Sequence, residues 1–249
     1  MKSIDSCKKL VTLVLGFTGA FISGSQALAD EQSFTVKPFI FAEGVGKEFY
    51  VEKVRTAHIV AATGLSLEYK PTSKVSIEAT FGQGDFDIGG IIIDTKVRGV
   101  SYRRDVSALT SWPFFIKTAY MTREVAAEKT KVDKDSGKSL TDKLDSRLST
   151  TDLLLGVSVS LNKYIHLKVA TGLSRWHMKA NIDDQLMIGN FRATTYRVVN
   201  SKGTNAVHEL GLEGGTDKWS LFLLMSQRSL GSKAEENIQG ISLGGSYSF

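Results

Sequence analysis

The sequence predicts an all-β protein: a closed antiparallel transmembrane barrel of about ten strands, with short turns at one end and long loops at the other. Three observations favour this fold class. Strand-length segments alternate apolar and polar residues, the connections between them alternate in length, and aromatic residues stand at one end of the strands. A strand with lipid on one face and water on the other needs such alternation, because successive side chains point to opposite faces. Counts of eight or twelve strands remain open.

Each predicted strand reaches the length of about 9–11 residues that a tilted strand needs to cross a bilayer. In the clearest segment, Leu153, Leu155 and Val157 alternate with polar or small residues. The stretch 219–225 is apolar on both faces, so alternation does not set its register. The predicted strands are Phe34–Val45, Thr56–Lys70, Lys74–Phe86, Lys96–Val106, Pro113–Val125, Thr150–Leu161, Tyr164–Met178, Asn205–Gly215, Lys218–Arg228 and Asn237–Phe249.

The connections between these segments alternate between a short and a long class. The short ones are 71–73, 107–112, 162–163 and 216–217, and the long ones are 46–55, 87–95, 126–149, 179–204 and 229–236. In a membrane-spanning barrel the turns lie on one side and the long loops on the other, so the strand number is even and both chain ends lie on the short-turn side. The aromatic residues predicted to form a girdle at that side are Phe34, Tyr69, Trp112, Tyr164, Trp219 and Phe249.

The final strand carries the most specific pattern. Ile241, Leu243, Tyr247 and the terminal Phe249 share one face, and serine and glycine occupy the other. A chain that ends on an aromatic residue in this way resembles the Gram-negative outer-membrane β-barrels, in particular the small single-chain outer-membrane proteins. The resemblance implies a place in the cell outer membrane, short turns in the periplasm, and contact with outer-membrane lipid and lipopolysaccharide. It also implies that Tyr247 and Phe249 are the assembly signal for the barrel-assembly machinery.

Residues 1–29 are predicted to be a cleaved signal peptide ahead of a barrel domain over residues 30–249. Lysines precede an apolar run that ends in an A-x-A site at Ala29. Cys7, the one cysteine, lies in this segment, so the mature chain has no thiol for a disulfide or a metal. Removing the segment lowers Lys+Arg from 31 to 28 and Asp+Glu from 26 to 25, leaving a net charge of about +3. Nucleic-acid binding is therefore not expected, and we expect a monomer without cofactor or metal.

The predicted register turns charged residues of both signs toward the lumen. They are Lys37, Glu43, Glu68, Glu78, Arg103, Lys117, Arg123, Asp152, Lys168, Glu209 and Glu213. Under one interpretation these charges pair across a filled interior, because a barrel of eight to ten strands has little room beyond its own side chains. Under the other they line a narrow, porin-like pore with a charged constriction.

An enzyme is not expected. Asp85, Asp87 and His177 stand at outer strand ends and resemble the acidic and histidine positions of the omptin family of outer-membrane proteases. Arg175 stands where that pattern would have Asp, so His177 lacks a carboxylate to fix its tautomer. A Ser–His lipid deacylase is not expected either, because adjacent residues such as His208 and Glu209 point to opposite faces of a strand.

The longest outer loops, 126–149 and 179–204, are the expected surface for partners, since loops carry much of the binding function of barrels. Within the second, Ile182–Ile188 and Phe191–Val199 predict a hairpin that extends above the membrane, whereas 129–147 is predicted to be mobile. The leading functional hypothesis is a structural or narrow-pore barrel. The alternative is a surface binding or adhesion protein acting through these loops, and an omptin-like protease comes third.

Overall fold

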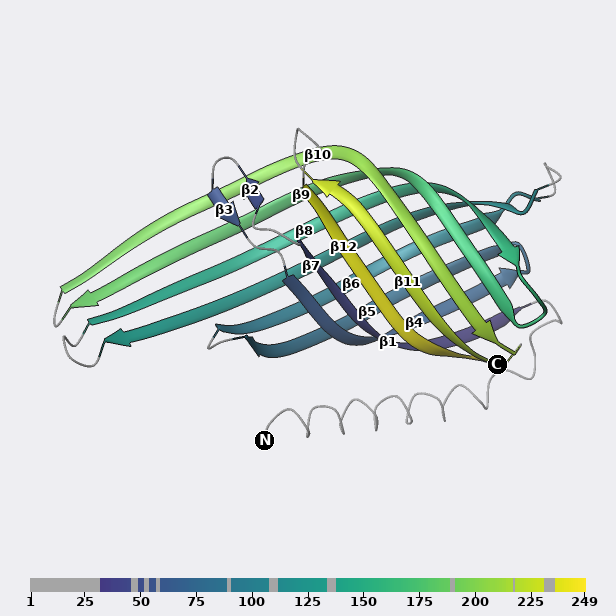
Figure 1. The fold of residues 1–249 in the computed structure, drawn as a ribbon, viewed down its shortest axis with the longest axis horizontal. Coiled ribbons are helices and arrows are strands. Elements are labelled where there is room, and N and C mark those ends of the chain that lie inside the picture. Colours follow the sequence, from purple (N-terminus) through teal and green to yellow (C-terminus); the bar gives the residue numbers. More distant parts are fainter. Residues whose placement is uncertain are drawn as a thin grey trace.

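The computed structural model describes residues 32–45, 49–51, 54–56, 59–88, 91–107, 112–133, 138–188, 191–216, 218–230 and 236–249. They form a closed ten-stranded barrel in the order β1-β12-β11-β10-β9-β8-β7-β6-β5-β4, and every strand pairing is antiparallel (Figure 1). The predicted all-β barrel and its strand number are thus confirmed. Residues 1–29, predicted to be the signal peptide, lie outside the described residues.

The barrel strands are β1 (Ser33–Val45), β4 (Ile59–Thr72), β5 (Val75–Ile88), β6 (Ile91–Asp105), β7 (Phe114–Asp133), β8 (Lys138–Ser160), β9 (Ile165–Ile188), β10 (Phe191–Gly215), β11 (Trp219–Leu230) and β12 (Glu236–Ser248). The short strands β2 (Phe49–Val51) and β3 (Val54–Thr56) pair with each other as a separate two-stranded sheet. Within the described residues no helix is long and apolar enough to span a membrane.

The barrel closes where the last strand meets the first. β12 pairs with β1 from Ile238 to Ser248, and the amide of Phe249 donates to the carbonyl of Phe34 at 2.9 Å. On the outer surface Tyr247 packs between Trp219 and Phe249, with ring centroids 4.4 Å and 4.7 Å away. The aromatic pattern of the final strand therefore places its rings outside the barrel, at the end where the turns are short.

Side chains alternate between the two faces of the wall. Along β8 the exposed Leu153 and Leu155 alternate with the buried Asp152 and Leu154. Glycines let bulky inward side chains lie flat against the wall: a side chain at Gly156 would collide with the ring of Phe115, and one at Gly203 would lie 2.8 Å from the Trp176 indole. The interior is thus filled by large side chains that lie over small ones.

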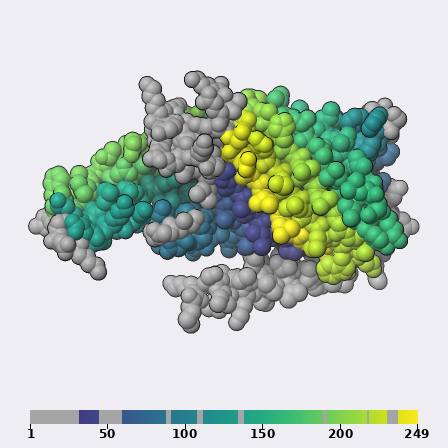
Figure 2. Space-filling model, in the orientation of Figure 1, coloured from purple at the N-terminus to yellow at the C-terminus, as the bar shows by residue number. Residues whose placement is uncertain are grey.

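The barrel strands fall into a long and a short class, and this difference sets the shape of the molecule. β7–β10 have 20, 23, 24 and 25 residues, whereas β1, β4, β5, β6, β11 and β12 have 12 to 15. The four long strands continue beyond the barrel rim as one arm, called here the outer sheet (Figures 1 and 2). The predicted hairpin within 179–204 is confirmed as the outer parts of β9 and β10.

The prediction of a loop over 126–149 was wrong, because most of that segment is strand. In 179–204 the strands also continue on both sides of the predicted hairpin, over 179–181 and 200–204. The described part of 129–147 is paired throughout, and the mobility predicted for it stays a prediction. Toward the tip of the outer sheet, over 138–145, 182–188 and 191–198, side chains on both faces are exposed or half-buried, so its strands lack the apolar alternation by which the membrane strands were found. Cross-strand polar pairs support them, such as Lys143–Glu128 at 3.0 Å and Thr130–Thr141 at 3.1 Å.

Candidate functional site

The interior charges were the sequence-based candidates for function, and the structure places them together inside the barrel wall. Each lies on the strand face that also carries the buried residues. They divide into two groups. One lies near the middle of β7 and β8 and near the outer ends of β1 and β11, and is called here the mid-barrel network; the other lies nearer the short turns. The two groups differ in burial, and the difference matters for whether ions could pass.

The mid-barrel network consists of Glu43, Arg123, Asp152 and Arg228, from β1, β7, β8 and β11. Arg123 Nε lies 2.7 Å from Glu43 Oε1. Arg228 contacts both carboxylates, with Nη1 at 3.4 Å from Glu43 and Nη2 at 2.7 Å from Asp152. Strands on opposite sides of the barrel are therefore joined through the lumen.

Hydroxyl groups add hydrogen bonds to this network. Arg123 Nη1 donates to the Thr150 hydroxyl at 3.1 Å, and the Ser174 hydroxyl donates to Asp152 at 2.6 Å. The four charged side chains are at most 5% exposed. Two cations and two anions balance, as buried charges must when water is excluded.

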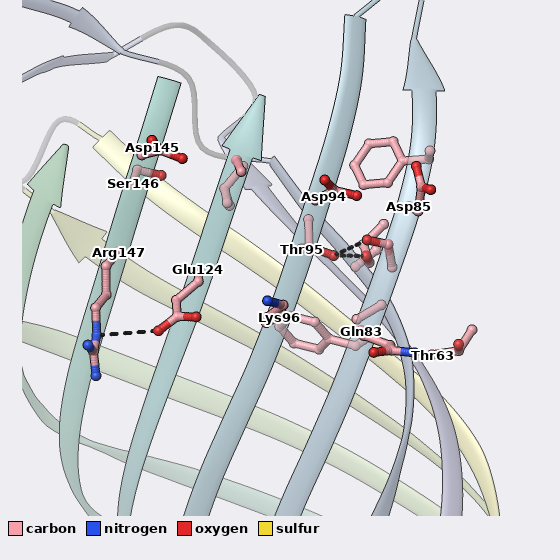
Figure 3. A pocket seen from close by; sticks show the side chains of 18 of the residues that line it. Thr63, Gln83, Asp85, Asp94, Thr95, Lys96, Glu124, Asp145, Ser146 and Arg147 are labelled. Atoms are coloured by element: carbon pink, nitrogen blue, oxygen red, sulfur yellow. Dashed lines mark hydrogen bonds and ion pairs between the residues drawn. The ribbon is translucent and has the colours of Figure 1, made fainter. Parts of the chain in front are cut away.

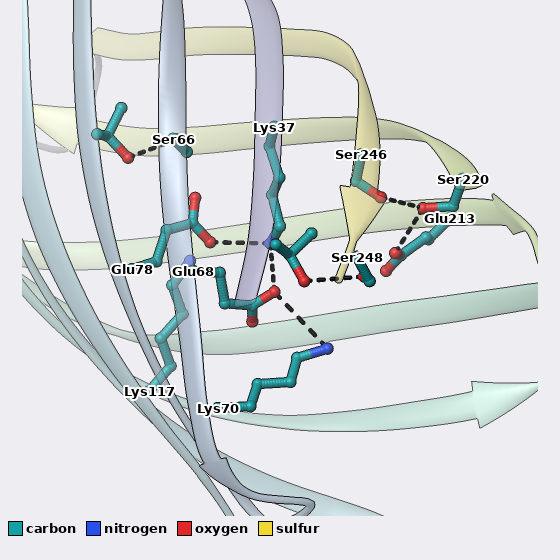
Figure 4. A network of polar contacts seen from close by, with 12 residues as sticks. Lys37, Ser66, Glu68, Lys70, Glu78, Lys117, Glu213, Ser220, Ser246 and Ser248 are labelled. Carbon is teal, nitrogen blue, oxygen red and sulfur yellow. Dashed lines mark hydrogen bonds and ion pairs between the residues drawn. The ribbon is translucent and has the colours of Figure 1, made fainter. Parts of the chain in front are cut away.

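The second group of charges lies nearer the short turns (Figure 4). Lys37 Nζ lies 2.9 Å from Glu68 and 3.1 Å from Glu78. Lys168 lies 2.7 Å from Glu213, which also accepts a hydrogen bond from the Ser220 hydroxyl at 2.9 Å. The side chains of these ion pairs are between 11% and 33% exposed, so this end of the lumen is open to water.

Two further interior cations lie close to these groups. Lys117 pairs with Glu209 at 2.7 Å. Arg103 lies over the ring of Phe115, 4.1 Å from its centroid, in a cation–π contact. Every interior charge predicted from the sequence thus has a charged or aromatic neighbour in the barrel.

Apolar clusters fill much of the remaining interior. One surrounds Phe39, Phe41 and Val97, and a second surrounds Trp176 and Met178. A third consists of Phe115, Leu154, Ala170 and Val207. The sequence suggested a polar lumen, but large apolar residues share the inner face with the charges.

Arg228 is the network residue that the sequence did not identify. It follows the stretch of β11 that is apolar on both faces, so alternation did not predict which face its side chain occupies. The structure places Leu221 and Met225 outside, at 70% and 46% exposure, which turns Arg228 inward. The exposed Trp219 at the start of the strand was the available signal, since even-numbered residues must then face inward.

The residues considered for catalysis are not brought together. Asp85 and Asp87 lie on β5 and His177 on β9, and β6, β7 and β8 separate them in the barrel order. His177 Nε2 lies 2.7 Å from Asn200 Oδ1.

A Ser–His contact exists at the other end of the barrel. His166 Nδ1 lies 2.9 Å from the Ser160 hydroxyl. Its cross-strand neighbour Glu213 bonds to Lys168 and Ser220, so its carboxylate is already engaged. Where the structure describes the chain, no three His, Cys, Asp or Glu residues gather as a metal site.

An open concavity of about 1270 Å³ lies toward the outer ends of β4–β9 (Figure 3). Exposed side chains such as Thr63, Gln83, Lys96 and Arg147 contribute to its lining. Arg147 Nε lies 3.8 Å from Glu124 across neighbouring strands. Buried residues of the inner face, among them Phe41, Thr95 and Val125, line it as well, so the concavity lies partly inside the barrel wall and opens to water.

No protein-family model matches the chain, and no curated protein matches it. In structure it is similar to the translocator domain of the autotransporter NalP from Neisseria meningitidis, with a TM-score of 0.50 and 13% identity over 98% of each chain. The β domain of the Bordetella autotransporter BrkA matches with a TM-score of 0.43 and 12% identity, covering 88% of this chain and 99% of that one. Ail, the attachment invasion locus protein of Yersinia pestis, matches at 0.38 and 9%, covering 89% and 100%. The NalP match supports the fold alone, that of an outer-membrane β-barrel.

Proposed function

We propose that this protein is a sealed barrel of the outer membrane that holds the outer sheet above the membrane surface for binding. The observation that carries the first half of this proposal is the mid-barrel network. Arg228 joins Glu43 on β1 to Asp152 on β8 across the interior, with distances of 3.4 Å and 2.7 Å. A hydrated ion would have to break these contacts to pass.

A narrow pore is the weaker hypothesis for this geometry. A conducting constriction keeps its charges in water, so that ions can bind and leave. Here Arg123 and Glu43 are 1% and 0% exposed, and apolar clusters lie on the same inner face. The wetter charges near the short turns then form a shallow polar mouth that leads to a closed interior.

The outer sheet is strand length in excess of what a membrane-spanning barrel requires. Neither closure nor membrane crossing needs β7–β10 to be longer than their neighbours, and the extra length forms a paired sheet instead of loops. Binding through this sheet replaces the loop-mediated binding that the sequence suggested. An enzymatic role is not part of the proposal.

We also propose the partners that the final strand implies. With the turns in the periplasm, Tyr247 and Phe249 lie on the lipid-facing surface, available to the barrel-assembly machinery. The apolar outer face of β8 and β12, with Leu153, Leu155 and Leu243 more than 50% exposed, suits outer-membrane lipid, with lipopolysaccharide in its outer leaflet.

Planar-bilayer recording of the refolded mature protein tests the sealed barrel. We expect no resolved single-channel steps in the wild type, because the network and the apolar clusters leave no continuous water path. Arg228→Ala with Asp152→Ala serves as the comparison, since it removes the link across mid-barrel and should raise leak current. Stable, ion-selective channels in the wild type would reject the proposal in favour of a pore.

A further inference from the structure

The two long edges of β10 have different neighbours. On one side β9 pairs with it without interruption, from Phe191↔Ile188 to Gly214↔Ile165. On the other side pairing with β11 covers only Val207–Gly215. Among the described residues no strand pairs with 191–204 on that second side. An open edge of this length presents backbone N–H and C=O groups that alternate along the strand.

The other border of the outer sheet is covered. β6 pairs with β7 out to Ile92↔Glu128, so most of the length of β7 has neighbours on both sides. Only the part of β7 beyond Glu128 extends past β6, and it carries Lys129 and Lys131. This second edge, 129–133, is short, whereas the uncovered edge of β10 runs over 191–204.

The β10 edge lacks two of the devices by which proteins discourage further strand pairing, a proline and a bulge. Residues 191–204 contain no proline, and the one-to-one pairing with β9 shows no bulge. Phe191, Tyr196 and Val198 are about 60% exposed along it. A long, flat and partly apolar edge is the kind of template to which an extended peptide adds as a further strand.

Charge indicates which peptide would fit. Residues 191–204 carry Arg192, Arg197 and Lys202 and no Asp or Glu. On its closed side the same strand already pairs with an acidic one: Arg197 Nη2 lies 2.7 Å from Asp184 Oδ2 on β9, beside Asp183. A second copy of β10 would bring like charges together, whereas an acidic strand would be attracted.

We propose that the open edge of β10 over residues 191–204 binds an extended, acidic peptide segment of another protein by strand addition. This inference rests on the proposed binding role of the outer sheet and specifies its ligand. Backbone hydrogen bonds to the edge hold the peptide, its carboxylates face Arg192 and Lys202, and its apolar side chains pack beside Tyr196 or Val198.

Fluorescence anisotropy on the refolded mature protein tests this with a labelled, end-blocked peptide of sequence Asn181–Ile188, the acidic strand that β10 already accepts. A control peptide carries Lys in place of both aspartates. We expect the acidic peptide to bind at least about tenfold more tightly than the basic one. Absence of saturable binding of the acidic peptide, or equal binding of both, would overturn the proposal.

Two variants separate strand addition from simple charge attraction. Successive N–H groups of a strand point to opposite edges, so of Thr194→Pro and Thr195→Pro one removes a bond to β9 and the other only a donor at the open edge. The variant that retains wild-type heat stability should lose about tenfold or more in affinity for the acidic peptide. Wild-type affinity in that variant would contradict the mechanism.

N-methylated peptides provide the same test without altering the protein. Methyl groups on alternate amides block one edge of the peptide at a time, so one of the two alternating sets should abolish binding and the other should leave it. Binding by both sets would show that no strand is added.

A matched pair of charge variants tests the basic edge. Arg192→Glu should weaken binding of the acidic peptide by about fivefold or more, whereas Lys131→Glu, on β7 at the other border, should change it by less than about twofold. Equal effects would overturn the assignment to β10.

A second copy of the chain is the other ligand that the edge could bind. A dimer seen by ultracentrifugation, and abolished by the proline variant that retains wild-type heat stability, would identify a second copy as the ligand and overturn the proposal. If the protein conducts no ions and binds no peptide, only this inference is rejected. If it conducts ions and binds the peptide, only the sealed lumen is rejected.

Discussion

The barrel interior and the outer sheet use the same polar residue types in opposite ways. Inside, Arg123 and Arg228 are buried and tied to two carboxylates, so the charges join strands that are distant in sequence. In the outer sheet, Lys143 and Arg197 lie about half exposed beside single acidic partners on adjacent strands. The contribution of a charged side chain to the fold thus depends on how deeply it is buried and on the partners it contacts. Buried charges make the barrel one unit, and exposed ones leave the outer sheet free to meet a partner.

The largest effect is expected from removing Arg228. Arg228→Met leaves the Asp152 carboxylate buried without its cation, which costs about 3–5 kcal/mol for a broken buried pair. Urea unfolding in detergent, followed by the gel shift of the folded barrel, measures this loss. A cost under about 1 kcal/mol would mean that the network is wetter than its burial indicates.

A smaller effect is expected where water reaches the pair. Lys117 and Glu209 are 21% and 10% exposed, so Lys117→Met should cost about 1–3 kcal/mol through the unpaired Glu209. Adding Glu209→Leu should recover most of that loss, because an apolar pair needs no partner. If the double variant is as unstable as the single one, the pair is not what stabilises this part of the lumen.

The smallest effect is expected in the outer sheet. Arg197→Ala removes the contact with Asp184, but the arginine side chain is 50% exposed, so the free energy of unfolding should fall by about 0–1 kcal/mol. The same urea titration measures it. A loss as large as that of Arg228→Met would show that the two regions unfold together.

The barrel was predictable from the sequence because the membrane imposes a period of two on every crossing strand. Leu153 and Leu155 must face lipid, so Asp152 must face inward, and the same logic assigned Lys37 and Arg123 to the interior. The pattern failed where the environment does not alternate. Arg228 follows a stretch of β11 that is apolar on both faces. The tips of the outer strands contact water on both faces.

Partners across the lumen could not be predicted for a different reason. Glu43 and Arg228 are separated by 185 residues and meet only because the barrel closes with β12 beside β1. Alternation predicts which face of the wall a side chain occupies. It does not predict which residues of two strands lie at the same level of the barrel, because that depends on the register of strand pairing. The open edge of β10 was hidden for the same reason, since it exists only because β11 ends lower than β9.

Hydrogen exchange on the folded protein in detergent tests most directly whether the two regions are held differently. Amides in the outer parts of β8 and β9, residues 138–145 and 182–188, should exchange by local opening with little sensitivity to Arg228→Met, because the side chains there are exposed or half-buried on both faces of the sheet. Amides around Asp152 on β8 and Glu43 on β1 should exchange only with global unfolding, and faster in that variant. One uniform level of protection, lowered everywhere by Arg228→Met, would contradict the account.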